Sequence, residues 1–260
     1  MNDSIFKTFS VAALVCVVCS VLVSVAATSL APMQDANAVL DRQKNVIKAA
    51  GLVEPGEKLS ATEIGERFGK VEQVVIDLAT GDVKTDVKPE KLDLDRQLKD
   101  PTQSTALAPA KDLAGIKAIP NETVVYLVKG DDGAVKTLVL PVYGRGLWST
   151  MYGFLALEGD LKTVASLSFY KHGETPGLGG EISNEAIMSK WTDKSAFDAG
   201  GKPSVHFKKG SVAPDDPNAE YEVDGISGST LTCNGVNRTV AFWLGENGFG
   251  PYLAKLKMEN

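Results

Sequence analysis

The stretch VVYLVKGDDGAVKTLVLPV, residues 124–142, decides the fold class that we predict for this chain. Two apolar, valine-rich runs flank the polar sequence Asp131-Asp132-Gly133, and a glycine-containing turn between two such runs predicts a β-hairpin. The other elements that we predict are strands at residues 71–78 and 163–170 and helices at 36–50, 184–191 and 232–244. Strands and helices do not alternate along the chain, which predicts an α+β fold with a twisted, largely antiparallel sheet and flanking helices.

A long apolar segment precedes these elements. Residues 11–31, VAALVCVVCSVLVSVAATSLA, contain no charge and no proline, and about 20 such residues suffice to cross a bilayer as a helix. A cleavable signal peptide is the alternative, because small residues of the Ala-x-Ala type occur near Val25 and Ala27. The run is longer than the roughly 7 to 15 apolar residues of a signal peptide, so we predict a single, uncleaved N-terminal transmembrane helix.

The chain is expected to divide into four parts. These are a short tail at residues 1–10, the transmembrane helix at 11–31, an N-terminal segment at 32–110 that packs on the main domain, and the main domain at 111–260. A formal net charge of −6 argues against nucleic-acid binding, which needs a basic surface. Cys233 is the only cysteine outside the apolar run, so we predict no intramolecular disulfide in the soluble part.

The segment Asp224-Gly225-Ile226-Ser227-Gly228-Ser229-Thr230 is the most informative for chemistry. Gly225 and Gly228 let the backbone approach a ligand closely, and the amides at the start of a following helix favour an anion beside Thr230. Thr232 adds a second hydroxyl one turn later. An ordinary Ser/Thr turn that leads into a helix N-cap would use the same residues, so the residues alone leave both interpretations open.

Residues 224–232 resemble the flavinylation motif Asp-x-x-(Ser/Thr)-Gly-Ala-Thr-x-(Ser/Thr) of FMN-binding subunits in bacterial respiratory complexes. In that family a separate flavin transferase uses FAD and Mg²⁺ to attach FMN through a phosphoester to the last threonine of the core, and the resemblance places this attachment on Thr230. Ser229 stands where the family usually has alanine, which makes Ser229 a rival acceptor. The resemblance implies that the other motif positions also bind the cofactor, namely Asp224, Ser227, Gly228 and Thr232.

A first glycine-rich segment, Gly144-Arg145-Gly146-Leu147-Trp148, follows the hairpin. It lacks the third glycine and the strand–helix–strand unit of a dinucleotide-binding loop. Gly146 and Trp148 are instead candidates to line a pocket for the isoalloxazine ring. A core tryptophan at the end of a strand is the alternative for Trp148.

A second glycine-rich segment spans residues 172–181, HGETPGLGGE. Pro176 and the glycines after it make a loop with few side chains, whose amides could donate to the polar edge of a flavin. The segment is similar to the loop that the FMN-binding family places against the isoalloxazine, which implies contacts from Glu174, Thr175, Leu178 and Gly179. A general acid–base pair of His172 and Glu174 is the alternative. With His206 as the only other histidine, we predict neither a metal site nor a catalytic triad.

Over nearly its whole length the sequence is similar to the C-subunit family of the Na⁺-translocating NADH:quinone oxidoreductase. Besides the motifs above, residues 40–45, LDRQKN, and residues 248–253, GFGPYL, carry the resemblance. These two segments favour that family over the related G subunits of Rnf electron-transport complexes. A G-type Rnf subunit and a transmembrane FMN-binding sensor are the alternatives. A hydrolase that uses Ser227 would lack the Gly-x-Ser-x-Gly elbow.

The resemblance implies an electron-relay subunit that carries one covalent FMN within an inner-membrane respiratory complex that pumps Na⁺. Its partners would be the other subunits and the flavin transferase, it would have no catalytic residue of its own, and its large domain would be periplasmic. The charges that flank the apolar run predict the opposite orientation, because Lys7 precedes the run whereas Arg42, Lys44 and Lys48 follow it. We expect the periplasmic orientation, since long domains cross membranes largely regardless of charge.

Overall fold

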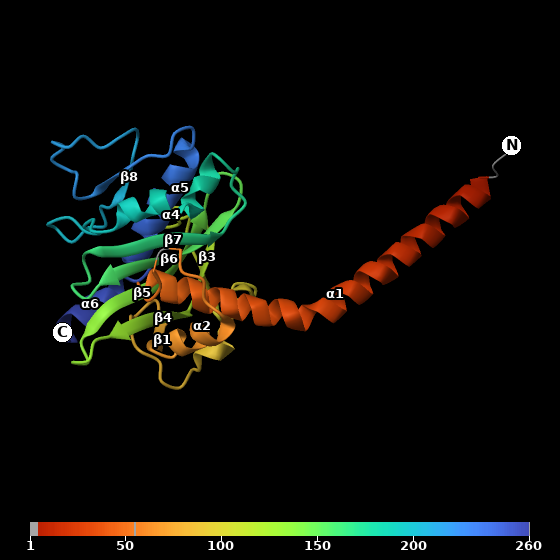
Figure 1. Cartoon of the computed structure of the whole chain (residues 1–260), viewed down its shortest axis with the longest axis horizontal. Coiled ribbons are helices and arrows are strands. Elements are labelled where there is room, and N and C mark those ends of the chain that lie inside the picture. Colours follow the sequence, from red (N-terminus) through yellow and green to blue (C-terminus); the bar gives the residue numbers. More distant parts are fainter. Residues whose placement is uncertain (1–4, 55, 260) are drawn as a thin grey trace. The chain divides into compact units, whose positions relative to one another are not determined.

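The computed structural model describes residues 5–54 and 56–259. These residues fall into two compact units that divide between Gln43 and Lys44. The first helix, α1 (Ile5–Ala49), spans this division and is the red-to-orange helix of Figure 1. By length and composition α1 could cross a membrane, with a mean hydropathy of 2.7 over 18 residues.

The prediction of two separate helices at residues 11–31 and 36–50 is wrong, because α1 is continuous through Pro32. A proline inside a helix removes one backbone hydrogen bond. The neighbours Leu30, Ala31 and Met33 have high helix propensity, so the helix continues on both sides of the proline.

The second unit is built on a five-stranded antiparallel sheet in the order β1-β4-β5-β6-β7 (Figure 1). The strands are β1 (Val71–Asp77), β4 (Glu122–Lys129), β5 (Val135–Arg145), β6 (Thr150–Glu158) and β7 (Val164–Lys171). The predicted hairpin is confirmed, since β4 pairs with β5 and Gly133 adopts a φ of 80° in the turn. The antiparallel α+β fold is likewise confirmed. Strand β1, which comes from the predicted segment at 32–110, joins the same sheet as the predicted main domain.

Strand β6 has no counterpart in our sequence prediction. Its sequence, TMYGFLALE, shows no alternation of apolar and polar residues, and Met151 and the run from Gly153 to Leu157 are buried. Both faces of β6 are covered, so neither face needs polar side chains. Gly153 also interrupts the pattern at an irregularity in the pairing with β7.

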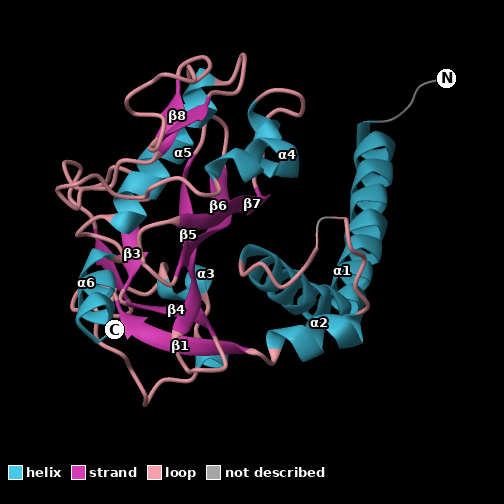
Figure 2. Cartoon of the chain, turned by 60° about the vertical axis from the view of Figure 1, so that its left-hand side comes forward, coloured by secondary structure: helices cyan, strands magenta, loops and turns pink. Residues whose placement is uncertain are grey.

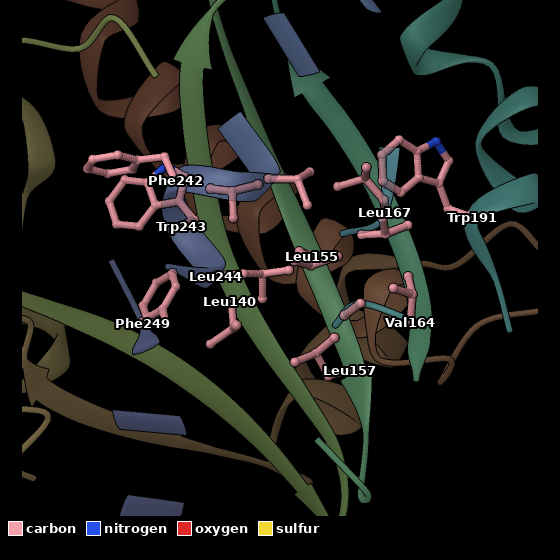
Figure 3. Packing of buried hydrophobic residues seen from close by; sticks show 14 of the residues in the cluster. Leu140, Leu155, Leu157, Val164, Leu167, Trp191, Phe242, Trp243, Leu244 and Phe249 are labelled. Carbon is pink, nitrogen blue, oxygen red and sulfur yellow. The ribbon is translucent and has the colours of Figure 1, made fainter. Parts of the chain in front are cut away.

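The helices cover both faces of the sheet. On one face, Leu140, Leu155 and Leu157 point toward the aromatic residues of α5 (Thr230–Leu244), as Figure 3 shows. The other face carries α2 (Ala61–Phe68), whose Phe68 ring lies 6.3 Å from that of Tyr126. Figure 2 shows α2 and α6 (Gly250–Glu259) on opposite sides of the sheet.

The remaining elements are short. They are η1 (Pro89–Lys91), α3 (Leu94–Gln97), β2 (Ser104–Ala106), β3 (Ala118–Pro120), η2 (Gly179–Ser183), α4 (Glu185–Met188), η3 (Ser189–Trp191), β8 (His206–Lys208) and β9 (Glu222–Asp224). The helix predicted at 184–191 is therefore one turn of α-helix followed by a 3₁₀ turn. Helices α2 and α6 were not predicted, and α5 begins at Thr230 rather than at the predicted Thr232.

Helix α5 lies close against β5, and two glycines allow this approach. A Cβ at Gly144 would lie 1.9 Å from Thr239 Oγ1, and a Cβ at Gly235 would lie 2.6 Å from the carbonyl oxygen of Arg145. The indole Nε1 of Trp243 donates to the carbonyl of Tyr143 at 2.7 Å. Strand β5 therefore determines where the first residue of α5, Thr230, is held.

Candidate functional site

An open pocket of about 360 Å³ lies at the N-terminus of α5. Three segments form its wall: the turn after β5, the loop that follows β7, and the start of α5. The lining residues are Leu147, Trp148, Glu174, Thr175, Leu178, Gly179, Gly228, Ser229, Thr230, Leu231 and Thr232. The structure thus brings together residues that are far apart in the sequence.

Most of the candidate residues from the sequence line this pocket. They are Trp148, Glu174, Thr175, Leu178, Gly179, Gly228, Ser229, Thr230 and Thr232. Leu147 and Leu231 also line it but were not predicted. An isolated leucine is ordinarily a core residue, so its type alone does not predict a place in a pocket. Only the positions of Leu147 and Leu231 next to Trp148 and Thr230 could have indicated it.

Three candidates lie outside the lining. Gly146 makes room for the Glu174 carboxylate, because a Cβ at Gly146 would lie 2.6 Å from Glu174 Oε1. Ser227 is exposed, and its carbonyl oxygen accepts a hydrogen bond from Ser229 Oγ at 3.4 Å. Asp224 contacts Lys190 and Val212, outside the pocket lining.

Asp224 accepts hydrogen bonds from two other segments. Lys190 Nζ donates to Oδ2 at 2.8 Å, and the amide of Val212 donates to Oδ1 at 2.7 Å. The hydrogen bond from Lys190, followed by that from Val212, holds the pKa of the Asp224 carboxyl below its usual value. The contacts of Asp224 therefore support the loop that leads into α5.

Glu174 connects all three segments of the pocket wall. Its Oε1 accepts from the amides of Trp148 at 2.9 Å and Ser149 at 3.2 Å. Its Oε2 accepts from the amide of Leu147 at 3.1 Å and from Thr232 Oγ1 at 2.6 Å. Burial raises the pKa of Glu174, but the hydrogen bonds from Thr232 and the three amides outweigh burial, so its pKa lies below the usual value. The carboxylate is therefore ionised at neutral pH.

His172 does not form an acid–base pair with the Glu174 carboxylate. Its Nδ1 accepts from the backbone amide of Glu174 at 3.2 Å, and its Nε2 lies 2.6 Å from Ser183 Oγ. Ser183 Oγ donates in turn to the carbonyl of Gly180 at 2.9 Å, which assigns the ring proton to Nε2. This chain of contacts shapes the loop and leaves the ring without a partner for proton transfer in the pocket.

The two candidate acceptors differ in exposure. Thr230 is exposed and is the first residue of α5, whereas Ser229 is only 5% exposed. Ser229 occupies the N-cap position but makes no capping hydrogen bond through its side chain. The interpretation as an ordinary side-chain helix cap is therefore not realised. The amides of the first turn of a helix have no intrahelical partner, and here they lie beside the Thr230 hydroxyl.

The mouth of the pocket is apolar. Trp148 is 65% exposed, so the alternative of a core tryptophan is wrong. Leu147, Leu178 and Leu231 are also exposed. A patch of exposed large apolar side chains around backbone donors fits a ligand with a flat apolar part and an anionic part. An FMN group has this composition, with an isoalloxazine ring and a phosphate.

The fold and this site define a class of protein, the FMN-binding domain proteins. The FMN-binding domain family matches residues 146–245, which include every residue of the pocket lining. The chain is 45% identical over 258 residues to the C subunit of the Na(+)-translocating NADH-quinone reductase of Yersinia pestis, covering 98% of this chain and 94% of that protein. It is 46% identical over 257 residues to the C subunit of the Pseudomonas aeruginosa enzyme, covering 98% and 97%.

The chain belongs to the family of C subunits of the Na(+)-translocating NADH-quinone reductase, as its sequence predicted. Among solved structures it is similar to Shewanella oneidensis NqrC, with a TM-score of 0.75 and 36% identity over 84% of this chain and 97% of that one. The C subunit from Parabacteroides distasonis has the same fold, with a TM-score of 0.64 and 23% identity over 86% of this chain and 96% of that one.

Proposed function

We propose that this chain is the electron-relay subunit of a Na⁺-pumping NADH:quinone oxidoreductase and that it carries one FMN, bound by a phosphoester to Thr230. Membership of the C-subunit family supports the assignment to that complex. One structural observation carries the attachment site. Thr230 is exposed and lines the pocket at the start of α5, where the N-cap residue Ser229 makes no capping hydrogen bond through its side chain.

The residues of the pocket divide the task of holding the cofactor. The Thr230 oxygen would carry the phosphate, and the first-turn amides of α5 with the positive end of the helix dipole would stabilise its negative charge. Leu147, Trp148, Leu178 and Leu231 would contact the ring. When bound, the flavin supplies the electron-transfer chemistry, while the protein retains it and tunes its electronics.

A flavin transferase would make the attachment with FAD as the donor. The Thr230 oxygen forms a bond to the phosphorus next to the riboflavin part of FAD, and the bond from that phosphorus to AMP breaks. The hydroxyl proton is released, so the products are the phosphoester and AMP. The 5% exposure of Ser229 disfavours that hydroxyl in the same reaction.

The large domain would lie on the periplasmic side of the inner membrane, anchored by the apolar part of α1. The family resemblance supports this orientation, and the flanking lysines and arginine oppose it. A covalent link has a clear purpose in an exported domain, because a diffusible cofactor would be lost there.

The attachment is tested by expressing the full chain together with a flavin transferase and viewing a denaturing gel under ultraviolet light. The unmodified chain and Ser229→Ala should fluoresce, and Thr230→Ala should not. Peptide mapping should find the flavin on the peptide that contains Thr230. Flavin on Ser229 or Ser227 of the unmodified chain would show that the assignment is wrong.

A further inference from the structure

The Glu174 carboxylate has no role in the attachment chemistry, yet it lies in the wall of the pocket and is only 5% exposed. We propose that Glu174 is a positioning residue: its carboxylate holds the three wall segments together, and its negative charge makes the flavin harder to reduce. This inference rests on the proposed function, because it concerns a flavin in this pocket.

The site around Glu174 is built for a carboxylate. Its four donors come from the turn at residues 147–149 and from Thr232 on α5. Two glycines make the space, because a Cβ at Gly146 would lie 2.6 Å from Glu174 Oε1 and a Cβ at Gly179 would lie 3.1 Å from Glu174 Oε2. The amide of Gly173 also donates to Ser149 Oγ at 2.6 Å, which fastens the loop to the same turn.

These contacts give the second hydroxyl of the motif a function. Thr232 is 1% exposed and its Oγ1 points away from solvent, toward Glu174. Thr230 is exposed two residues earlier on the same helix. The two threonines therefore act differently: Thr230 presents its hydroxyl to the ligand, whereas Thr232 fixes the helix start to the loop through Glu174.

The charge of Glu174 is not cancelled by an ion pair among these contacts. Its donors are three amides and one hydroxyl, all of them neutral. Among the described residues that line the pocket, none is a lysine, arginine or histidine. A charge at a partly dry site acts over several ångströms. Since reduction adds negative charge to a bound group, a fixed anion nearby disfavours the reduced form.

The charge is tested on flavin-loaded full-length protein by spectroelectrochemical titration. Glu174→Gln should raise the midpoint potential, with about a tenfold increase in the ratio of reduced to oxidised flavin at a given potential, or about 30 mV for a two-electron couple. Thr232→Val removes one donor but keeps the charge, so it should not raise the potential. Glu181→Gln, which removes a carboxylate that accepts from Asn184 and does not line the pocket, is the matched control and should leave it unchanged.

No rise in Glu174→Gln, or any rise in Thr232→Val, would overturn the role of the charge. The second outcome would mean that any loosening of the wall changes the potential. If Glu174→Gln does not take up flavin, Thr232→Val decides by itself: a rise in that variant overturns the proposal, and an unchanged or lower potential supports it.

The positioning role is tested without flavin, by hydrogen exchange of the full chain produced without a transferase. A glutamine has only one acceptor oxygen, so the amides at residues 147–149 should exchange about tenfold faster in Glu174→Gln, while amides inside α5 keep their protection. Unchanged exchange at 147–149 would overturn this role. Failure of the proposed function gives a different result: the chain without any substitution, produced together with a transferase, would carry no flavin on Thr230.

Discussion

Replacing Gly144 by alanine should separate α5 from β5. The new Cβ would lie 1.9 Å from Thr239 Oγ1, 2.9 Å from Thr239 Cβ and 3.1 Å from Thr239 Cγ2. Thr239 is fully buried, and its Oγ1 already donates to the carbonyl of Gly235 at 2.8 Å, so the side chain cannot rotate freely away. Overpacking of this kind costs about 1 to 3 kcal/mol.

The assay is thermal unfolding of the purified full-length chain, followed by circular dichroism. For a unit of roughly 200 residues each kcal/mol corresponds to about 2 to 4 °C, so Gly144→Ala should lower the Tm by about 2 to 12 °C. In a chain that already carries Thr239→Ala, adding Gly144→Ala should lower the Tm by less than half as much as it does in the unmodified chain. This is expected because Thr239→Ala removes Oγ1 and Cγ2, so that only the contact with the Cβ of residue 239 remains.

Gly65→Ala is the matched control. Gly65 lies in α2 and a Cβ there would meet no heavy atom within 4 Å, so alanine should stabilise the helix by about 0.5 to 1 kcal/mol. Unfolding of Gly144→Ala at the same temperature as the unmodified chain would contradict this prediction, and so would a loss that Thr239→Ala does not rescue. The first result would mean that the helix and the sheet can move apart without cost, and the second that the loss does not come from the contact with Thr239.

Three other predictions concern the site and the membrane. Trp148→Ala should keep its covalent flavin, and its Tm should stay within about 2 °C of that of the unmodified chain, because Trp148 is exposed. The visible spectrum of the flavin should shift, and an unchanged spectrum would show that Trp148 does not contact the ring. Because the pKa of Glu174 is held below its usual value near 4.5, its contribution to stability is fully present above that value and is lost as the pH falls through the lower, folded-state pKa. Acid unfolding of Glu174→Gln should therefore be less steep below pH 4.5 than that of the unmodified chain, and parallel curves would contradict this. A cysteine at Asp131, in the exposed hairpin turn, should react with an impermeant thiol reagent in intact spheroplasts, whereas protection until lysis would place the domain in the cytoplasm.

Several parts of the fold could be predicted from local sequence. The hairpin of β4 and β5 has a glycine in its turn and apolar runs on both sides. The apolar run in α1 is long enough to predict a membrane-spanning helix by its length alone. Strand β6 could not be predicted in the same way. Its alternation is absent because helices cover both faces of the sheet, and this covering is a property of the assembled domain.

The sequence by itself determined the family, the apolar helix and the hydroxyl-rich segment at the start of α5, because each of these depends on a local pattern of neighbouring residues. It left open which of Ser229 and Thr230 is exposed, whether Trp148 is core or surface, and whether Glu174 pairs with His172. Only the tertiary structure decided the geometry behind these questions. Exposure depends on what packs over a side chain, and the four donors to Glu174 lie 25 to 58 residues away in sequence, so no local pattern could bring them together.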